Sequence, residues 1–257
     1  MPDLNALAKQ YRGELFEKFL EVGQGHPGST FSMIEIAVSL YHGGFVRPSI
    51  DKVIVSKGHA TVTLYPILKE LGIIPQQEWN NWGKSESCLR VFGNLTIPGI
   101  DMTSGSLGHG IGVGAGMALA AKRDQVNKQV YVIISEGELY EGSTWESFLF
   151  VNHFQLNNLT ILIDINNLMI LGKTDACLTL NPIEKKLAGF DFELFNIDGH
   201  NPEEIVGCLE IKSCRPKIIL ANTVKGKGFS VMENEASWHY WQQLTSEQVA
   251  QCRKEIM

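Results

Sequence analysis

Short strand-like segments, most of them apolar at consecutive positions, alternate with segments of helical spacing along this chain. The strand-like segments cover 52–56, 129–134, 160–164, 193–197 and 216–221. Strands that are apolar on both faces indicate a parallel sheet with helices on both sides. The 257 residues are therefore predicted to form an α/β fold: a single domain over residues 1–257, with a mostly parallel sheet flanked by helices.

Helices are predicted between these strands from the spacing of apolar residues and from capping residues. Asp3 is a candidate cap for the first helix. Ser32 and Glu35 form a candidate capping box for a helix that ends near His42. Further helices are expected at 61–71, at 141–154, and from about residues 202 and 245. In the helix at 141–154, Leu149 is expected to face the core.

Composition and charge exclude several classes of function. The chain has 22 basic and 28 acidic residues and a formal net charge of −6, so it is not expected to bind nucleic acid. No apolar run reaches the roughly 18 residues of a membrane span, and the N-terminus lacks the pattern of a secretory signal. The five cysteines are scattered and form no Cys-x-x-Cys pair. We therefore expect reduced thiols and a cytoplasmic location.

Two polar residues follow neighbouring strand-like segments, where ligands bind in a parallel sheet. Glu136 comes directly after the segment at 129–134, and Asn166 follows the segment at 160–164. One strand–helix–strand unit separates them, so their side chains would meet at the same edge of the sheet. Carboxylate and amide oxygens suit Mg²⁺ or Ca²⁺. On spacing alone, a pair of ordinary polar loop residues is an equal interpretation.

Three histidines lie in loops beside glycine or tryptophan. They are His26 in Gly-His-Pro-Gly, His59 in Ser-Lys-Gly-His and His239 in Ser-Trp-His. Each one alone is more often structural or solvated, whereas three together favour a phosphate- or sugar-binding site. Lys225, in a Lys-Gly-Lys-Gly segment, would either meet an anion or lie in an exposed basic loop. Alternating glycines at 105–116 permit close packing of a helix or close approach of a ligand.

The order of the motifs is similar to that in the N-terminal part of transketolases. The motifs are Gly-His-Pro-Gly at 25–28, Ser-Lys-Gly-His at 56–59, Thr-Ser-Gly-Ser-Leu-Gly at 103–108, Glu-Gly-Glu-Leu-Tyr-Glu-Gly at 136–142, Asp-Ile-Asn at 164–166, Asp-Gly-His at 198–200 and Ser-Trp-His at 237–239. From about Tyr11 to His239 the chain resembles, above all, the stand-alone N-terminal subunits of split transketolases. This resemblance implies a fold of the thiamin-diphosphate-binding type, with thiamin diphosphate and a divalent metal as cofactors.

The resemblance also implies roles for individual residues. The metal ligands would be Glu136, Asn166 and the backbone carbonyl of Leu168. The cofactor-binding residues would be His59, Gly105, Ser106, Leu107, Gly137, Glu138, Asn166 and His239. The catalytic residues would be His26, His59, His239 and Glu141, the last of these in a proton relay at a dimer interface.

Two departures from the family pattern bear on metal and substrate. The family's Gly-Asp-Gly is Ser135-Glu136-Gly137 here, and the longer carboxylate makes Ca²⁺ or Mn²⁺ as suitable as Mg²⁺. The family's Gly-His-Pro near the mouth of the active site is Gly-Asn-Leu at 93–95. Because Asn94 does not carry a proton near neutral pH, a ketose donor is in question, and pyruvate is an alternative two-carbon donor.

The resemblance favours a transketolase-like transferase that moves a two-carbon unit to a sugar, a sugar nucleotide or a similar carbonyl acceptor. A C-terminal subunit with the pyrimidine domain would complete the site, in an α2β2 assembly. The α subunit of a 2-oxo-acid dehydrogenase is a less favoured enzyme class. A non-catalytic paralogue that binds the cofactor is the alternative from another class, and Glu136 in place of aspartate is its chief support.

Overall fold

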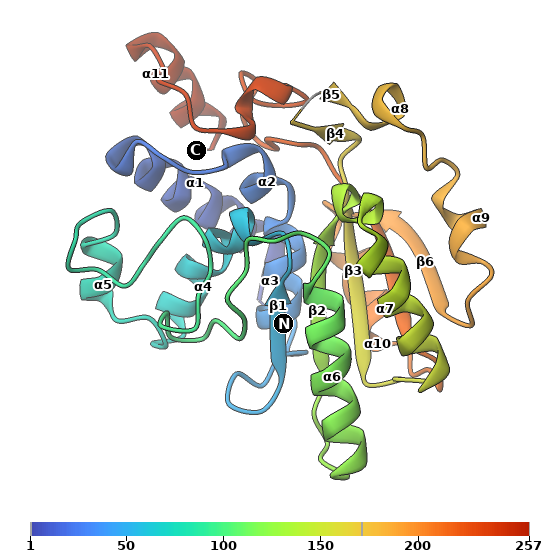
Figure 1. The fold of residues 1–257 in the computed structure, drawn as a ribbon. Coiled ribbons are helices and arrows are strands. Elements are labelled where there is room, and N and C mark those ends of the chain that lie inside the picture. Colours follow the sequence, from blue (N-terminus) through green and yellow to red (C-terminus); the bar gives the residue numbers. More distant parts are fainter. Residues whose placement is uncertain (1, 171, 257) are drawn as a thin grey trace.

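Five parallel strands form the central sheet of the computed structural model, which describes residues 2–170 and 172–256. The order across the sheet is β1-β2-β3-β7-β6 (Figure 1). The strands are β1 (Lys52–Val55), β2 (Val130–Ser135), β3 (Leu159–Ile165), β6 (Glu193–Asp198) and β7 (Lys217–Asn222). This sheet confirms the parallel α/β fold and all five expected strands.

Helices cover both faces of the sheet (Figure 1). Helices α1 (Leu4–Val22), α3 (Ile34–His42), α4 (Leu64–Glu70) and α10 (Pro202–Glu210) pack in the core of one face. Helices α6 (Gly110–Arg123), α7 (Gly142–His153) and α9 (Ile183–Leu187) pack in the core of the other. The remaining elements are α2 (Pro27–Ser32), η1 (Gly58–Thr63), α5 (Gln76–Asn80), η2 (Glu136–Tyr140), β4 (Leu168–Met169), β5 (Gly172–Lys173), α8 (Thr174–Cys177), η3 (Ala236–His239) and α11 (Ser246–Glu255).

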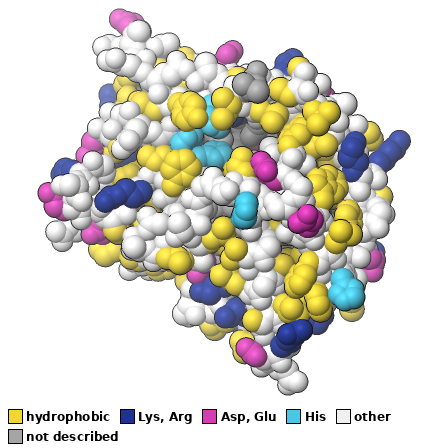
Figure 2. Space-filling model, in the orientation of Figure 1, with side chains coloured by type: hydrophobic (Ala, Val, Ile, Leu, Met, Phe, Trp, Pro, Cys, Tyr) yellow, Lys and Arg dark blue, Asp and Glu magenta, His cyan; other side chains and the backbone are white. Residues whose placement is uncertain are grey.

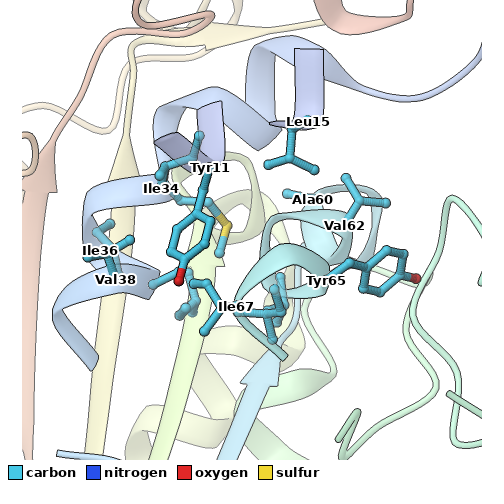
Figure 3. Packing of buried hydrophobic residues seen from close by; sticks show 14 of the residues in the cluster. Tyr11, Leu15, Ile34, Ile36, Val38, Ala60, Val62, Tyr65 and Ile67 are labelled. Atoms are coloured by element: carbon cyan, nitrogen blue, oxygen red, sulfur yellow. The ribbon is translucent and has the colours of Figure 1, made fainter. Parts of the chain in front are cut away.

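Alternate residues of each buried strand point to opposite cores. In β2, Tyr131 and Ile133 belong to the core under α1 and α3, whereas Val132 and Ile134 belong to the core under α6 and α7. Figure 3 shows the first core, where side chains from the N-terminal helices and from the segment after β1 meet. A strand with two buried faces needs apolar residues at consecutive positions, which is the pattern that the sequence shows.

The ends of two helices test the capping predictions. Asp3 caps α1 as expected, because its carboxylate accepts a hydrogen bond of 3.0 Å from the Ala6 N–H. The capping box at Ser32 was wrong. The chain is already helical from Pro27, and the Ser32 hydroxyl donates instead to the Asp164 carboxylate at 2.6 Å. A buried charge on a distant strand thus takes the hydroxyl that local sequence assigns to a helix end.

The inward orientation expected for Leu149 was also wrong. Leu149 is 62% exposed on α7, whereas Phe148 beside it is buried. Within the described residues no helix has the length and apolarity needed to cross a bilayer. All five cysteines of the sequence are unpaired, as the sequence indicated.

Candidate cofactor-binding site

A cavity of about 280 Å³ opens where the carboxyl ends of β1, β2, β3 and β7 meet. Its walls come from segments far apart in the sequence: Ser29, His59, Leu107, Ser135, Glu136, Gly137, Tyr140, Glu141, Asn166, Leu168, Met169, Ile170, Lys225 and His239. This is the edge at which parallel sheets bind ligands. Figure 2 shows histidine side chains gathered in a hollow of this face, with hydrophobic side chains beside them.

Glu136 and Asn166 lie side by side, as their positions after adjacent strands predicted. Strands β2 and β3 are paired in parallel, with Ser135 opposite Asp164. The Glu136 carboxylate accepts a hydrogen bond of 2.9 Å from the N–H of Asn167. The Asn166 side-chain oxygen accepts one of 3.2 Å from the N–H of Leu168. Both loops therefore present oxygen atoms to the same cavity.

The Glu136 carboxylate is buried without a cation beside it. Glu136 is only 3% exposed, and no Lys, Arg or His in the described ranges forms an ion pair with it. Burial raises the pKa of Glu136, and the nearby charges of Asp164 and Asp175 raise it further, against hydrogen bonds from Thr174 and Asn167. A carboxylate in this position gains from a bound divalent cation, and the oxygen donors around it suit a hard metal.

The three candidate histidines come together around one point. The ring centroids of His26 and His59 are 5.2 Å apart, those of His26 and His239 5.3 Å, and those of His59 and His239 5.4 Å. Burial and the Lys225 charge lower the pKa of His26 to about 4 and that of His239 to about 4. Burial and Lys57 hold the pKa of His59 well below its ordinary value. All three imidazoles are therefore neutral at pH 7.

Few hydrogen bonds within the described residues occupy the nitrogen atoms of these imidazoles. The His59 ring pairs with the Ser29 hydroxyl at 3.1 Å. The buried Nδ1 of His26 has no hydrogen-bond partner within the described residues. A neutral imidazole with an unpaired nitrogen is able to accept or donate a proton, so the cluster can act on hydroxyl and carbonyl groups of a bound substrate.

Lys225 lies in the wall of the cavity rather than in an exposed loop. The residue is 2% exposed, and its amine is 3.4 Å from Nδ1 of His239. Burial lowers the pKa of Lys225 to about 8, with Asp164 opposing and Lys57 adding to the shift. A partly charged, desolvated amine at this place favours an anionic group in the cavity. Of the two interpretations left open by the sequence, the exposed basic loop was wrong, because Lys225 is buried.

A fully buried ion pair, which the sequence did not reveal, lies behind the cavity. Lys57 after β1 pairs with Asp164 on β3, and both side chains are inaccessible to solvent. Burial alone would raise the pKa of Asp164, but Lys57 and the hydroxyls of Ser32 and Thr223 outweigh it and hold the pKa below its usual value. The pair joins β1, α2, β3 and the segment after β7. An acidic residue in an otherwise apolar strand was the one signal for it.

Glu138 supports the cavity from behind and is not among its lining residues. Its carboxylate accepts hydrogen bonds from the N–H groups of Gly108 and Ser135, each at 2.9 Å, and from the Ser56 hydroxyl. Three segments are thereby tied together next to Leu107, which lines the cavity. In this structure Glu138 positions the wall that the family resemblance assigns to the cofactor.

Some of the other candidate residues line the cavity and others lie outside it. Leu107, Gly137, Glu141 and Leu168 line the cavity, whereas Gly105 and Ser106 are exposed and outside its lining. His26 adjoins the cavity through the rings of His59 and His239. A Cβ atom at Gly137 would meet only the Ser135 hydroxyl, at 3.5 Å, so the backbone there is open to a ligand.

Asn94 does not line this cavity but a separate hollow of the same molecule. Its side-chain oxygen accepts a hydrogen bond of 2.9 Å from the Thr96 N–H and another from the Thr96 hydroxyl. The carbonyl is thus used within its own turn, and only the NH₂ group is left to contact a substrate.

The fold and this site define a class of protein: an α/β domain with a cavity at the carboxyl edge of its parallel sheet, lined by a buried carboxylate, a buried lysine and neutral histidines. Comparisons with known proteins make this class specific. Residues 6–256 match the family model described as "Transketolase, thiamine diphosphate binding domain". The chain belongs to the transketolase family, which confirms the resemblance in the sequence.

Two relatives are separate subunits of about the same length. The chain is 31% identical over 263 residues to one subunit of the apulose-4-phosphate transketolase of Phocaeicola vulgatus, covering 98% of this chain and 93% of that protein. It is 34% identical over 250 residues to a 6-deoxy-6-sulfo-D-fructose transketolase subunit of a Clostridium species, covering 92% and 90%.

A solved structure shows the same fold within a longer chain. Transketolase from Campylobacter jejuni superimposes with a TM-score of 0.90 at 25% sequence identity. The alignment covers 98% of this chain and 42% of that one, so this chain spans about two fifths of the transketolase that it matches.

Proposed function

We propose that this chain is the cofactor-holding subunit of a two-subunit, thiamin-diphosphate-dependent transketolase. It transfers a two-carbon unit to a sugar or sugar-like carbonyl acceptor. One observation carries the proposal: the uncompensated Glu136 carboxylate shares a cavity with Lys225 and two of three clustered neutral histidines. Such a cavity suits a ligand that combines a divalent cation with phosphate groups, and relatives named as transketolase subunits support the same reaction class.

Within this function two groups of residues would hold the metal and the diphosphate. Glu136, Asn166 and the Leu168 carbonyl would hold the divalent metal. Lys225 and His239 would bind phosphate oxygens, and the open backbone at Gly137 would let the diphosphate approach. When bound, thiamin diphosphate supplies the electron sink for breaking and forming the carbon–carbon bond.

The acid–base work falls to the histidine cluster. Because the pKa values of His26 and His239 lie near 4, both rings are neutral at pH 7 and would each offer a hydrogen-bond acceptor to a substrate hydroxyl. The neutral rings also avoid repelling the Lys225 ammonium. His59, held by Ser29, orients the cluster toward the cavity.

A partner subunit with the pyrimidine domain would complete the site. The support is that relatives covered over about nine tenths of their length are themselves named as subunits. Glu141, exposed on the cavity wall at the start of α7, would take part in a proton relay with a neighbouring chain. We propose an α2β2 assembly, and the five free thiols suit a reducing compartment such as the cytoplasm.

The metal and cofactor assignment is tested by titrating thiamin diphosphate with Mg²⁺, Ca²⁺ or Mn²⁺, followed by tryptophan fluorescence. Glu136→Ala and Asn166→Ala should each abolish metal-dependent cofactor binding with an unchanged circular dichroism spectrum. Glu136→Asp should keep binding and favour Mg²⁺, since the shorter side chain suits a smaller cation. Unchanged cofactor affinity in both alanine variants would refute the assignment. Cofactor binding by the unmodified chain without any two-carbon transfer in the presence of its partner would instead favour a non-catalytic paralogue.

Pyruvate is a second candidate for the two-carbon donor, and the environment of Asn94 favours testing it. With its carbonyl bound to Thr96, Asn94 offers a hydroxylated donor one NH₂ group and no proton carrier. Carbon dioxide release from pyruvate by the reconstituted complex would establish this donor. Turnover of a ketose phosphate alone would exclude it.

A further inference from the structure

A second hollow, larger than the cofactor cavity, opens beside the histidine cluster. It has a volume of about 660 Å³, and its lining includes Gln24, Lys84, Arg90, Phe92 and Ser104. No carboxylate from the described residues lines it, although it contains two cationic side chains. Neither the cofactor nor the metal accounts for these two cations, because the residues proposed to hold those groups line the other cavity.

A third hollow of about 350 Å³ adjoins the second one and is aromatic. The two share Gln24, Val91 and Phe92, so they adjoin at Phe92, and together they are called the depression here. Tyr240 and Trp241 line the aromatic half. Phe92 is 42% exposed and Tyr240 55%, which leaves much of the surface of both rings open to solvent. Exposed aromatic rings at the edge of a hollow are suited to stacking against a planar ring of a ligand.

The two cations keep free hydrogen-bond donors. The Lys84 amine has one partner within the described chain, the Asn81 side-chain oxygen at 3.3 Å. One nitrogen of Arg90 donates to the backbone carbonyls of Ser87 and Leu89. The rest of the guanidinium stays open. Arginine with open donors binds phosphate oxygens in pairs.

Two acidic residues lie near these cations but outside the lining of the hollow. Glu78 lies near Arg90, but its carboxylate accepts hydrogen bonds from the Cys88 N–H at 2.7 Å and the Ser87 hydroxyl at 3.0 Å. Glu86 is exposed near Lys84. Neither carboxylate lines the hollow.

The depression connects to the reacting centre through His26. The ring centroids of Phe92 and Tyr240 lie 5.4 Å and 5.1 Å from that of His26. His26 in turn packs on His59 and His239, which line the cofactor cavity. A substrate whose carbonyl group reaches the cofactor cavity would therefore extend past His26 into the two hollows.

We propose that this depression binds the nucleoside diphosphate part of a sugar-nucleotide acceptor. The base stacks on Phe92 and Tyr240, and the diphosphate binds Lys84 and Arg90. An open-chain sugar phosphate would use the cations but would leave both aromatic rings uncovered. The inference rests on the proposed function and specifies its acceptor.

The test is direct binding to the full chain, measured by calorimetry in the presence of thiamin diphosphate and Mg²⁺. The probes are UDP-glucose, GDP-mannose and, for comparison, ribose 5-phosphate. At least one sugar nucleotide should bind about tenfold more tightly than ribose 5-phosphate. Phe92→Ala and the double variant Lys84→Ala with Arg90→Ala should each weaken that binding at least about fivefold. Arg123→Ala, which removes an exposed cation at the far end of α6, should have no effect.

Cofactor binding separates failure of this inference from failure of the proposed function. The Phe92, Lys84 and Arg90 variants should keep the parent affinity for thiamin diphosphate, because these residues do not line its cavity. The inference is overturned if neither sugar nucleotide binds while the cofactor does, if ribose 5-phosphate binds equally well, or if the variants bind the nucleotides unchanged. Loss of thiamin diphosphate binding by the parent chain would contradict the proposed function itself.

Discussion

At the scale of single residues, the site depends on charges that the fold removes from water. Lys225 keeps an amine beside three imidazoles, and Glu136 keeps a carboxylate without a counter-ion. Neither arrangement lowers the free energy of the protein by itself, because each leaves a charge poorly solvated. Both become favourable when an anion and a cation arrive together, as in a metal–diphosphate complex.

The pKa of Lys225 predicts how cofactor binding depends on pH. Only the ammonium form attracts a diphosphate, and this form is lost as the pH rises through about 8. A bound diphosphate raises the pKa, so affinity should fall by up to about tenfold for each pH unit above that value. Fluorescence titrations between pH 7 and pH 9 at constant Mg²⁺ measure the slope. Lys225→Arg, which stays charged, should flatten the profile, and an unchanged slope in this variant would assign the effect to another group.

The ion pair between Lys57 and Asp164 predicts a large change in stability. Lys57→Met leaves the Asp164 carboxylate buried and unpaired, at a cost of about 3–5 kcal/mol in the free energy of unfolding. Lys57→Met combined with Asp164→Leu removes both charges and should recover much of the loss. Urea denaturation of the three proteins measures these differences. A single variant as stable as the parent would show that water reaches Asp164.

At the scale of elements, helix α6 has glycines that pack against the sheet and glycines that face solvent. A Cβ atom at Gly110 would lie 2.3 Å from Cβ of Ser56, and one at Gly114 would lie 2.4 Å from a methyl group of Val132. One at Gly116 would meet nothing within 4 Å. The first two glycines let the helix approach the sheet closely, whereas Gly112 and Gly116 lie on the exposed face. Close packing therefore explains one face of the glycine-rich segment.

This difference gives a matched pair of variants. Gly114→Ala should lower the free energy of unfolding by about 1–3 kcal/mol, because the methyl group would overlap Val132. Gly116→Ala should raise it by about 0.5–1 kcal/mol, because alanine favours the helix and has room. Chemical denaturation of the chain without its partner gives both values. Equal effects at the two positions would contradict the packing of α6 on β2.

At the scale of the whole molecule, helices α6 and α7 expose apolar side chains. Val113 lies on α6, Leu149 and Phe150 lie on α7, and Glu141 precedes the first turn of α7. Exposed apolar side chains in one region mark an interaction surface. This surface adjoins the cofactor cavity through Glu141, which supports assembly with further chains at this side.

The proposed assembly predicts that the chain alone binds the cofactor, whereas turnover requires the partner subunit. Purified alone, the chain should bind thiamin diphosphate with metal but show no transfer of a two-carbon unit. Addition of the pyrimidine-domain subunit should produce activity, and Leu149→Lys should weaken the assembly by placing a charge in the apolar contact. Analytical ultracentrifugation and a coupled transfer assay measure the two effects. Full activity from this chain alone would rule out the need for a partner.

Local pattern was sufficient to predict a parallel sheet and the succession of its strands along the chain. Consecutive apolar residues specify strands buried on both faces, and Asp3 caps α1 through a contact three residues away, so the interactions are encoded in neighbouring positions. Glu136 and Asn166 were predicted to meet because parallel strands bring their carboxyl ends to one edge, whereas the three histidines were expected near the cofactor only through the family resemblance. The family resemblance added their expected roles.

Tertiary structure alone decided the features that depend on distant partners. Ser32 caps no helix because Asp164, far along the chain, takes its hydroxyl. Lys225 is buried because α2 and η3 close over it, and Leu149 is exposed because Phe148 fills the core position of α7. The aromatic and cationic hollows beside His26 likewise combine segments that no periodicity relates. Short-range propensity fixes which elements form, whereas burial and pairing of charges are settled only when those elements pack.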